Sequence, residues 1–450
     1  MRKLAFCFLS VLVLAGCRKE YVTDNAVLSR PANTYAGTLT RSYFTLMCTL
    51  SKSTPGFFPP QVARAYGYMG LASYEAVVHG ISGGQSLAGQ LNGLNRNDLP
   101  YPVAGLEYNW GIASNAALAD MARKMFETNI TAANLLAVAT LEQNGLADLS
   151  SSTSPAVVER SVQFGKAVAE ALYQYAASDG GDKSHLDPFQ LPFTIGSNPG
   201  NWVPTGALLT PIAPRWGNCR PFIVANVTST QGAVPLPFST NTSSAFYKEA
   251  MEVYNQVRNN TPQQITIARY WSDDPFNTCT PAGHTFNILT QLLGESGATL
   301  EKTAVAYAQL GIAASDAFIA CWKQKYAHLL LRPVSYIRTN IDPGFTTVLG
   351  TPAFPSFTSG HSTQIAAGSR ILVGLFTNGV DNYAFTDKSQ EQYGFAPRSF
   401  SNFNQMAEEC AISRFYGGIH YPMDNEAGLD QGRIVGNNVI RLLQWPKNIR

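Results

Sequence analysis

The sequence predicts an all-α protein in which two four-helix-type bundles pack together and carry long ordered loops. Three observations support this fold class. Apolar residues recur at three- and four-residue spacing through long Ala-rich segments, which is typical of amphipathic helices. The sequence shows no convincing strand-like alternation and no internal repeat. The chain has 450 residues, of which 45% are hydrophobic, so it can bury a sizeable core.

Residues 1–17 predict a lipoprotein signal peptide. Two basic residues precede an apolar run that is too short to span a membrane comfortably, and the run ends in Leu14-Ala15-Gly16-Cys17. These residues resemble a bacterial lipobox, in which Cys17 becomes the lipidated first residue; the alternative is an ordinary signal peptide with a chance cysteine. We expect an exported protein, anchored by lipid to the bacterial envelope in the periplasm or at the outer membrane, with a water-soluble body.

The rest of the chain divides into a tether and two helical halves. Residues 18–36 are polar and predict a flexible tether. The N-terminal half, residues 37–298, contains a Pro- and Gly-rich stretch at 180–243 that retains Trp and Phe, which favours an ordered functional loop. The C-terminal half, residues 299–450, carries the candidate site. The clearest helical periodicity lies at 60–80, 109–126, 154–178 and 299–325.

Charge and cysteine usage exclude several functional classes. The net charge is only +2 and charged residues are 14% of the chain, so we expect no nucleic-acid partner. Beyond the signal peptide the cysteines are odd in number and widely spaced, without a CxxC or CxxCH motif, which argues against zinc, iron–sulfur and c-type haem sites. A disulfide between Cys219 and Cys279 is one pairing that would suit an exported protein.

Two cationic residues mark the first of three candidate site segments. Lys325 and Arg332 in CWKQKYAHLLLRP are seven residues apart, so they share one helix face if the helix continues to Pro333. No Asp or Glu lies near them in the sequence. Two unpaired cations on one face indicate an anion site.

The second segment, FPSFTSGHST at 354–363, predicts the start of a helix at Ser359, Gly360 and His361. Free N–H groups and the positive end of the helix dipole would face whatever lies before Ser359, which is how proteins bind tetrahedral oxyanions. The third segment, SRFYGGIHYPMDNEAG, contains Arg414 and His420 on either side of a Gly-Gly turn. Asp424 follows four residues after His420 and could fix the tautomer of its imidazole.

Each of these residues has an ordinary structural explanation when it is taken alone. A lone Lys or Arg is usually a solvated surface charge, a lone His is usually a hydrogen-bonded structural group, and a Ser-Gly pair is usually a helix cap. The joint pattern of K-x6-R-P, S-G-H and S-R-x5-H, complete and in that order, is far less ordinary.

The three segments resemble the signature of the vanadium-dependent haloperoxidases and the type 2 phosphatidic-acid phosphatases, which share a pocket for vanadate or phosphate. The likeness covers residues 322–424, with Thr358 in place of the usual Pro, and a weaker likeness covers 267–288. The resemblance implies that vanadate is the cofactor rather than haem. Its implied oxyanion-binding residues are Lys325, Arg332, Ser359, Gly360, Arg414 and His420.

The same resemblance assigns the catalytic roles. His420 would be the ligand to vanadium in a haloperoxidase or the nucleophile in a phosphatase, and His361 would be the general acid–base. Lys325 would polarise the oxidant that hydrogen peroxide provides. Trp322 and Phe354 fall where haloperoxidases place aromatic residues beside the cofactor, so they would form the halide pocket; the alternative is that both are core aromatics.

The choice of chemistry rests on features outside the shared pocket. Soluble phosphatases of the superfamily are shorter than this chain and its lipid phosphatases span the membrane, whereas this chain resembles the flavobacterial vanadium iodoperoxidases in length and lipobox. We therefore expect a haloperoxidase whose small-molecule substrates are halide and hydrogen peroxide, with iodide first and bromide second. Two alternatives stay open: a phosphohydrolase that works through a phosphohistidine at His420, and a lipoprotein that binds oxyanions without catalysis.

Overall fold

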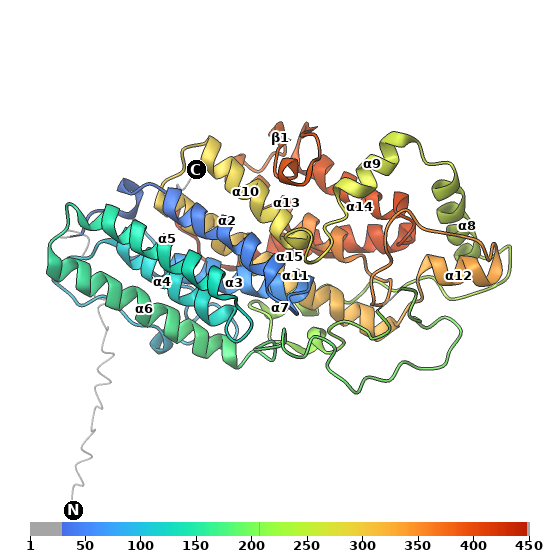
Figure 1. Cartoon of the computed structure of the whole chain (residues 1–450), viewed down its shortest axis with the longest axis horizontal. Helices are drawn as coiled ribbons and strands as arrows, with labels where there is room; N and C mark the ends of the chain where they lie inside the picture. Colours follow the sequence, from blue (N-terminus) through green and yellow to red (C-terminus); the bar gives the residue numbers. More distant parts are fainter. Residues whose placement is uncertain (1–28, 207, 448–450) are drawn as a thin grey trace, which may run out of the picture.

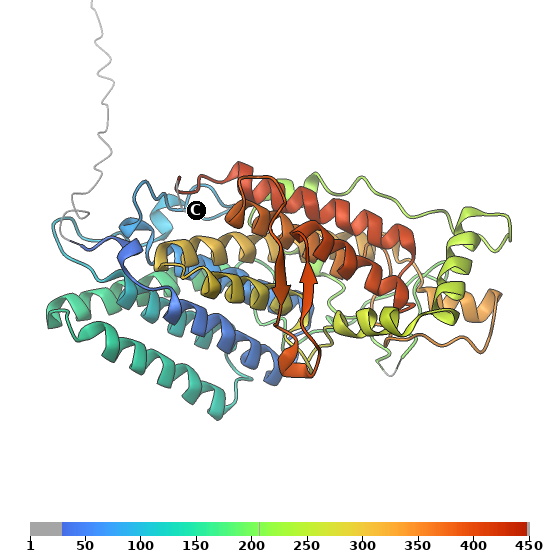
Figure 2. The ribbon, with the colours of Figure 1, turned by 90° about the horizontal axis from the view of Figure 1, so that it is seen from above.

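The structure is a computed structural model that describes residues 29–206 and 208–447. The predicted signal peptide, Cys17 included, lies outside the described residues. Figures 1 and 2 show an elongated arrangement of helices: α2 to α6 lie toward one end of the long axis, α8, α9 and α12 lie at the other, and α11, α13 and α15 run between them. The expected all-α fold is confirmed.

The helices have the following bounds. The α-helices are α2 (Thr38–Ser53), α3 (Pro59–Glu75), α4 (Trp110–Met125), α5 (Ala132–Ser150), α6 (Pro155–Ala177), α7 (Val224–Thr228), α8 (Ala245–Arg258), α9 (Pro262–Tyr270), α10 (Thr280–Glu295), α11 (Leu300–His328), α12 (Pro333–Asn340), α13 (Gly360–Phe376), α14 (Phe403–Tyr416) and α15 (Pro422–Leu442). Short 3-10 helices are η1 (Ala32–Thr34), η2 (Val78–Gly80), η3 (Arg96–Asp98), η4 (Trp216–Asn218) and η5 (Glu391–Tyr393). The four helices with the clearest periodicity in the sequence correspond to α3, α4, α6 and α11.

A small antiparallel ribbon interrupts the helical pattern. Strands β1 (Phe385–Asp387) and β2 (Arg398–Phe400) pair so that Phe385 lies opposite Phe400 and Asp387 lies opposite Arg398. Sequence patterning missed them because three residues are too few to show alternation. The ribbon matters for the site because Asp387, the last residue of β1, is fully buried.

Helix α11 is the central element of the fold. Its apolar 18-residue window would be long enough to cross a membrane, but all of that window is buried inside the protein, which fits a core helix. The helix ends at His328, and Leu329 adopts a left-handed backbone with φ 50°. The expectation that one helix face carries both Lys325 and Arg332 is therefore wrong: Arg332 is the N-cap residue of α12.

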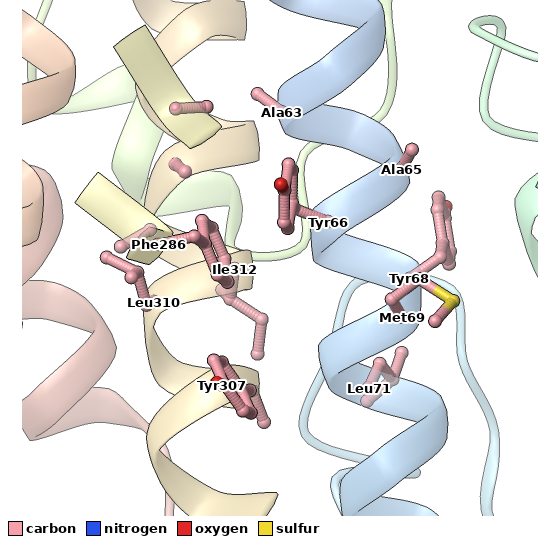
Figure 3. Packing of buried hydrophobic residues seen from close by; sticks show 14 of the residues in the cluster. Ala63, Ala65, Tyr66, Tyr68, Met69, Leu71, Phe286, Tyr307, Leu310 and Ile312 are labelled. Carbon is pink, nitrogen blue, oxygen red and sulfur yellow. The ribbon is translucent and has the colours of Figure 1, made fainter. Parts of the chain in front are cut away.

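Glycine permits α3 and α11 to cross closely. A Cβ atom on Gly311 would lie 2.9 Å from the carbonyl oxygen of Tyr66, and one on Gly70 would lie 2.3 Å from that of Tyr307. Figure 3 shows Tyr66, Phe286 and Tyr307 filling the space between these helices. The Tyr66 and Phe286 rings stack with centroids 4.2 Å apart. One continuous core therefore joins the predicted N-terminal and C-terminal halves.

Helices α13 and α15 run in parallel and in close contact because α15 carries glycines at every fourth position. Cβ atoms on Gly428, Gly432 and Gly436 would lie 2.8, 2.1 and 2.6 Å from the carbonyl oxygens of Ser359, Thr363 and Ala367. The residue numbers of the contacts rise in the same direction along both helices, so the helices are parallel and their N-termini lie near each other. Accordingly, the backbone N–H of Ser359 donates to the carbonyl of Asp424 at 2.9 Å.

Two expectations about the N-terminal region and the cysteines need correction. Residues 29–36 were expected to belong to a flexible tether, but Ser29 and Ala32 are buried and Ala36 forms a β-bridge with Thr299. The disulfide joins Cys48 to Cys279, whereas Cys219 is a free buried thiol. Cys48 on α2 and Cys279 at the start of α10 come together through helix packing that sequence spacing does not reveal.

Candidate active site

The three candidate segments converge on one cavity. Its empty volume, with the open solvent at its mouth included, is about 310 Å³. The residues that line it are Pro59, Pro281, Phe318, Trp322, Pro352, Phe354, Gly360, His361, Arg414, Ile419 and His420. Lys325, Arg332 and Ser359 are fully buried around this lining. All the sequence-predicted site residues, Cys17 excepted, are therefore brought to one region of the protein.

His420 is held by a carboxylate on one side and a cation on the other. Its Nδ1 lies 2.9 Å from Oδ2 of Asp424, and its Nε2 lies 3.0 Å from Nη1 of Arg332. Because arginine only donates, Nε2 must accept this bond, and Nδ1 carries the proton that faces Asp424. Burial and the nearby Arg332 lower the pKa of His420 well below its usual value. The imidazole is therefore neutral, with the Nε2 lone pair as its available electron pair.

The Asp424 carboxylate is itself anchored from several sides. Ser356 Oγ donates to Oδ2 at 2.5 Å, and the backbone N–H of Tyr421 donates to the same oxygen at 3.1 Å. Asp424 lies in the first turn of α15, where the helix dipole favours a negative charge. Burial nevertheless raises the pKa of this carboxyl. The hydrogen bonds keep the carboxylate oriented toward His420.

Lys325 and Arg332 bring two cations into the protein interior. Nζ of Lys325 donates to the carbonyls of Pro355 and Ser356 at 2.9 and 2.8 Å. Nε and Nη1 of Arg332 each donate at 2.8 Å, to the carbonyls of Phe354 and Ile419 respectively. Burial lowers the pKa of Lys325, and it lowers the pKa of Arg332 to about 9. An anion bound between these two cations would offset the free energy that burial of their charges costs.

Arg414 and His361 supply the opposite wall. Arg414, in the last turn of α14, donates from Nη1 to the carbonyl of Trp271. His361 lies in the first turn of α13, and its imidazole also hydrogen-bonds to the backbone of Ser272. Burial, with Arg414 as the next cause, lowers the pKa of His361 well below its usual value. His361 is therefore neutral and able to accept a proton.

Ser359 is the N-cap of α13. Helix capping is the ordinary structural role of a Ser-Gly pair. The Ser359 Oγ accepts a bond from the backbone N–H of Ser362 at 3.4 Å. A hydroxyl that accepts in this way still has its own hydrogen to donate. The cap and an oxyanion contact are therefore compatible, and the backbone N–H of Gly360 begins the same 17-residue helix.

Aromatic rings complete the cavity. Trp322 and Phe354 lie with ring centroids 4.9 Å apart. Nζ of Lys325 is 5.1 Å from the centroid of Phe354, and Cζ of Arg332 is 4.9 Å from the same centroid. Both aromatics belong to the core, and both also line the cavity. The two interpretations of these residues are not exclusive.

Sequence reasoning missed a second layer of charged residues behind His361. Oδ2 of Asp273 lies 4.0 Å from Nε2 of His361, and the other side of Asp273 contacts His284, Gln390 and, through His284, Asp387. The only signal was the weak likeness at 267–288, which contains Asp273 and His284 but not Asp387. Asp273 also has a left-handed backbone with φ 48°, a conformation that a non-glycine residue adopts only where its surroundings hold it.

Within residues 29–206 and 208–447, three nitrogens at the site have no hydrogen-bond partner, and neither does Oδ1 of Asp424. The nitrogens are Nη2 of Arg332, Nε of Arg414 and Nε2 of His361. Buried polar groups are rarely left unpaired, and these two arginine donors and the His361 acceptor lie around one cavity. Over the same part of the chain, no cluster of three His, Cys, Asp or Glu side chains could hold a metal cation directly. The donor set suits a tetrahedral oxyanion.

Comparisons with known proteins identify the family. A family model for the VCPO second helical-bundle domain matches residues 305–447. A bacterial vanadium-dependent iodoperoxidase of known crystal structure has 31% sequence identity to this chain. The alignment covers 92% of this chain and 99% of the iodoperoxidase chain, and the two structures superpose with a TM-score of 0.83. The chain belongs to the vanadium-dependent haloperoxidase family. A search of curated proteins found no match.

More distant members share the fold alone. Holo and apo structures of a bacterial vanadium-dependent chloroperoxidase are each 14% identical and superpose with TM-scores of 0.61 and 0.64. They cover 87% and 92% of this chain, and 95% and 99% of their own. Membership of the vanadium-dependent haloperoxidase family implies a vanadate cofactor. The unpartnered Arg332 and Arg414 nitrogens fit that group, because vanadate presents several oxygens to donors.

Proposed function

We propose that this chain is a vanadate-dependent peroxidase that oxidises iodide to hypoiodous acid with hydrogen peroxide. The balanced reaction takes iodide, hydrogen peroxide and one proton to hypoiodous acid and water. The observation that carries the proposal is the pair of buried, neutral imidazoles, His361 and His420, on one cavity with cationic donors around it. A protein that only binds an oxyanion would not need both.

The residues that would bind vanadate have two chemical roles, donation of hydrogen bonds to the oxyanion and ligation of vanadium. Lys325, Arg332 and Arg414 would donate charge-assisted hydrogen bonds to the oxyanion, together with the Ser359 hydroxyl and the Gly360 N–H. His420 would be the ligand to vanadium through Nε2, since Asp424 holds the proton on Nδ1. Bound vanadate supplies Lewis-acid activation of hydrogen peroxide without a change in the metal's oxidation state.

His361 would move the proton that the reaction requires. The residue lines the cavity, and its Nε2 is without a partner in the described part of the chain, so this nitrogen is the one available to hydrogen peroxide. A neutral imidazole accepts a proton from hydrogen peroxide and can return it to the peroxide oxygen that leaves as water. Lys325 would polarise the bound oxidant, because burial makes its ammonium a strong donor to any nearby anion.

Iodide is the favoured halide for two reasons. Iodide is the easiest of the halides to oxidise and the least strongly hydrated, so the apolar surfaces of Trp322 and Phe354 oppose its entry least. The similar iodoperoxidase structure supports the same choice at 31% identity. Bromide is the second candidate, since neither ring forms a specific contact that would reject it.

Three assays test the proposal on the chain after bound oxyanion has been removed. Triiodide formation from iodide and hydrogen peroxide is measured before and after orthovanadate is added, with p-nitrophenyl phosphate hydrolysis in parallel. We expect triiodide only with vanadate, and none from His420→Ala. His361→Ala should retain vanadate but lose turnover. Phosphate-ester hydrolysis that vanadate inhibits, without halide oxidation, would instead assign the same residues to a phosphatase.

A further inference from the structure

A buried histidine outside the cavity lies between two carboxylates. Nδ1 of His284 is 3.0 and 3.1 Å from the two oxygens of Asp273, and Nε2 is 2.9 Å from Oδ2 of Asp387. The three side chains are almost completely buried. They come from the loop before α10, from α10 itself and from β1, so the contacts join three separate parts of the fold.

The two carboxylates favour the charged form of His284. A neutral imidazole can donate from only one nitrogen, whereas an ionised carboxylate can only accept. Two carboxylates, one at each nitrogen, favour a proton on both, although the amide nitrogen of Gln390, a donor, also lies 2.7 Å from Nδ1. Burial alone would lower the pKa of His284, but Asp273 and Asp387 raise it to about 10. The Asp387 carboxylate also accepts from Tyr270 and from the backbone N–H of Ser389, which keeps it ionised.

Asp273 connects this group to the active site. Its Oδ2 lies 4.0 Å from Nε2 of His361, while its Oδ1 accepts from Nε2 of Gln390 at 2.9 Å. The left-handed backbone of Asp273 needs such contacts to persist. The other charged groups that act on His361 are cationic, namely Arg414 from α14 and Lys325 from α11, together with His284. Asp273 is therefore the anionic group closest to the nitrogen that handles the proton.

We propose that His284, held as an imidazolium between Asp273 and Asp387, is a positioning residue that fixes the Asp273 carboxylate beside Nε2 of His361. The inference rests on the proposed function, in which His361 transfers a proton. The imidazolium has two effects. It holds Asp273 in place, and its charge offsets part of the carboxylate's charge, so His361 can remain neutral until substrate delivers a proton.

Two variants test the role at different distances from the cavity. His284→Gln retains a hydrogen-bond donor but removes the positive charge. Asp387→Asn is nearly isosteric and touches His361 only through His284 and Asp273. Asp179→Asn is the matched control, because Asp179 is a buried carboxylate paired with Arg64 in the N-terminal half. For each protein, kcat with iodide, KM for hydrogen peroxide, the vanadate Kd and the melting temperature are measured.

We expect His284→Gln to lower kcat about tenfold or more and to change the vanadate Kd by less than about threefold, since an outer group that orients a reacting residue acts chiefly on turnover. Asp387→Asn should lower kcat by a smaller factor in the same direction, and Asp179→Asn should lower only the melting temperature. If His284→Gln keeps kcat within about twofold, or loses kcat and vanadate affinity in proportion to stability as a purely structural variant would, the inference is overturned.

A measurement on the protein without vanadate separates this inference from the proposed function. Nitrogen-15 NMR of the imidazoles should show His284 with both nitrogens protonated from pH 6 to about pH 9, given that its pKa is about 10. A neutral His284 at pH 7 would overturn the inference even if iodide oxidation is observed. Absence of iodide oxidation in the unmodified chain would overturn the proposed function. It would not contradict the protonated state of His284 that the NMR measurement reports.

Discussion

Nδ1 of His420 lies 2.9 Å from Oδ2 of Asp424, and this contact decides which nitrogen of the imidazole is available to the cavity. Asp424 Oδ2 already accepts from Ser356 and from the backbone of Tyr421, so it cannot rotate away without losing both bonds. The carboxylate therefore selects the tautomer whose lone pair is on Nε2, where it accepts from Nη1 of Arg332. The same pairing would serve a vanadium ligand or a phosphate-accepting nucleophile.

Asp424→Asn should weaken vanadate binding and lower turnover together. The amide retains the shape of the carboxylate, but it loses the charge that holds the Nδ1 proton. Substitution of a group that orients a metal-ligating histidine typically costs 10- to 100-fold, so a loss of about that size is expected in the vanadate Kd and in kcat/KM. Asp430→Asn, on an exposed position of the same helix, is the control. Equal vanadate affinity in both variants would contradict the assigned role.

The pH dependence of stability should report the charge on His284. The folded pKa is raised to about 10 from an unfolded value near 6.5. The stabilisation is therefore complete below pH 6.5 and is lost as the pH rises through 10. A shift of this size corresponds to a contribution on the order of 5 kcal/mol. Urea unfolding between pH 6.5 and 10 should show a steeper loss for the unmodified chain than for His284→Gln.

A partly buried histidine, His79, provides the control for that experiment. Burial alone lowers the pKa of His79 to about 4, so His79 is neutral across the whole window. His79→Gln should therefore leave the slope of stability against pH between 6.5 and 10 unchanged. If His284→Gln has the same slope as the unmodified chain, His284 is not charged in the folded protein.

Some relationships in this site could be predicted from sequence because they are local. His420 lies just before α15 and Asp424 lies in the first turn of that helix, so their contact joins residues only four positions apart. The start of α13 at Ser359 follows from its capping residues. Lys325 and Arg332 show the limit of this reasoning, because the chain leaves the helix at Leu329 and Arg332 reaches the site from the N-cap of α12.

Other relationships could not be predicted because they join distant parts of the chain. His284 and Asp387 are separated by 103 positions, and Asp387 reaches the interior on a strand of only three residues. The pairing of Cys48 with Cys279 spans 231 positions and depends on how α2 packs beside α10. Neither contact leaves a periodic pattern. The glycines at 428, 432 and 436 do leave one, and four-residue spacing of glycine is a signal of close helix packing that the sequence alone could have provided.

Removal of the Cys48–Cys279 disulfide should destabilise the protein while leaving the site chemistry in place. Cross-links of native domains typically contribute about 2–5 kcal/mol, largely by constraining the unfolded chain, and a loop of 231 residues favours the upper part of that range. Cys48→Ser with Cys279→Ser should lower the urea midpoint by a corresponding amount. Cys219→Ala, which removes a free thiol, is the control. A reductant should lower the midpoint of the unmodified chain and of Cys219→Ala, but not that of the double variant.

Gly432→Ala tests whether the contact between α15 and α13 holds the two halves of the site together. The added methyl group would lie 2.1 Å from the carbonyl oxygen of Thr363, so the helices must separate. Overpacking of this kind typically costs about 1–3 kcal/mol, and here it would also move Gly360 and His361 relative to His420. We therefore expect lower unfolding free energy and weaker vanadate binding in the same variant. Gly232→Ala is the control, since a Cβ there meets no atom within 4 Å. A Gly432→Ala protein that loses stability but binds vanadate normally would show that the site tolerates displacement of these helices.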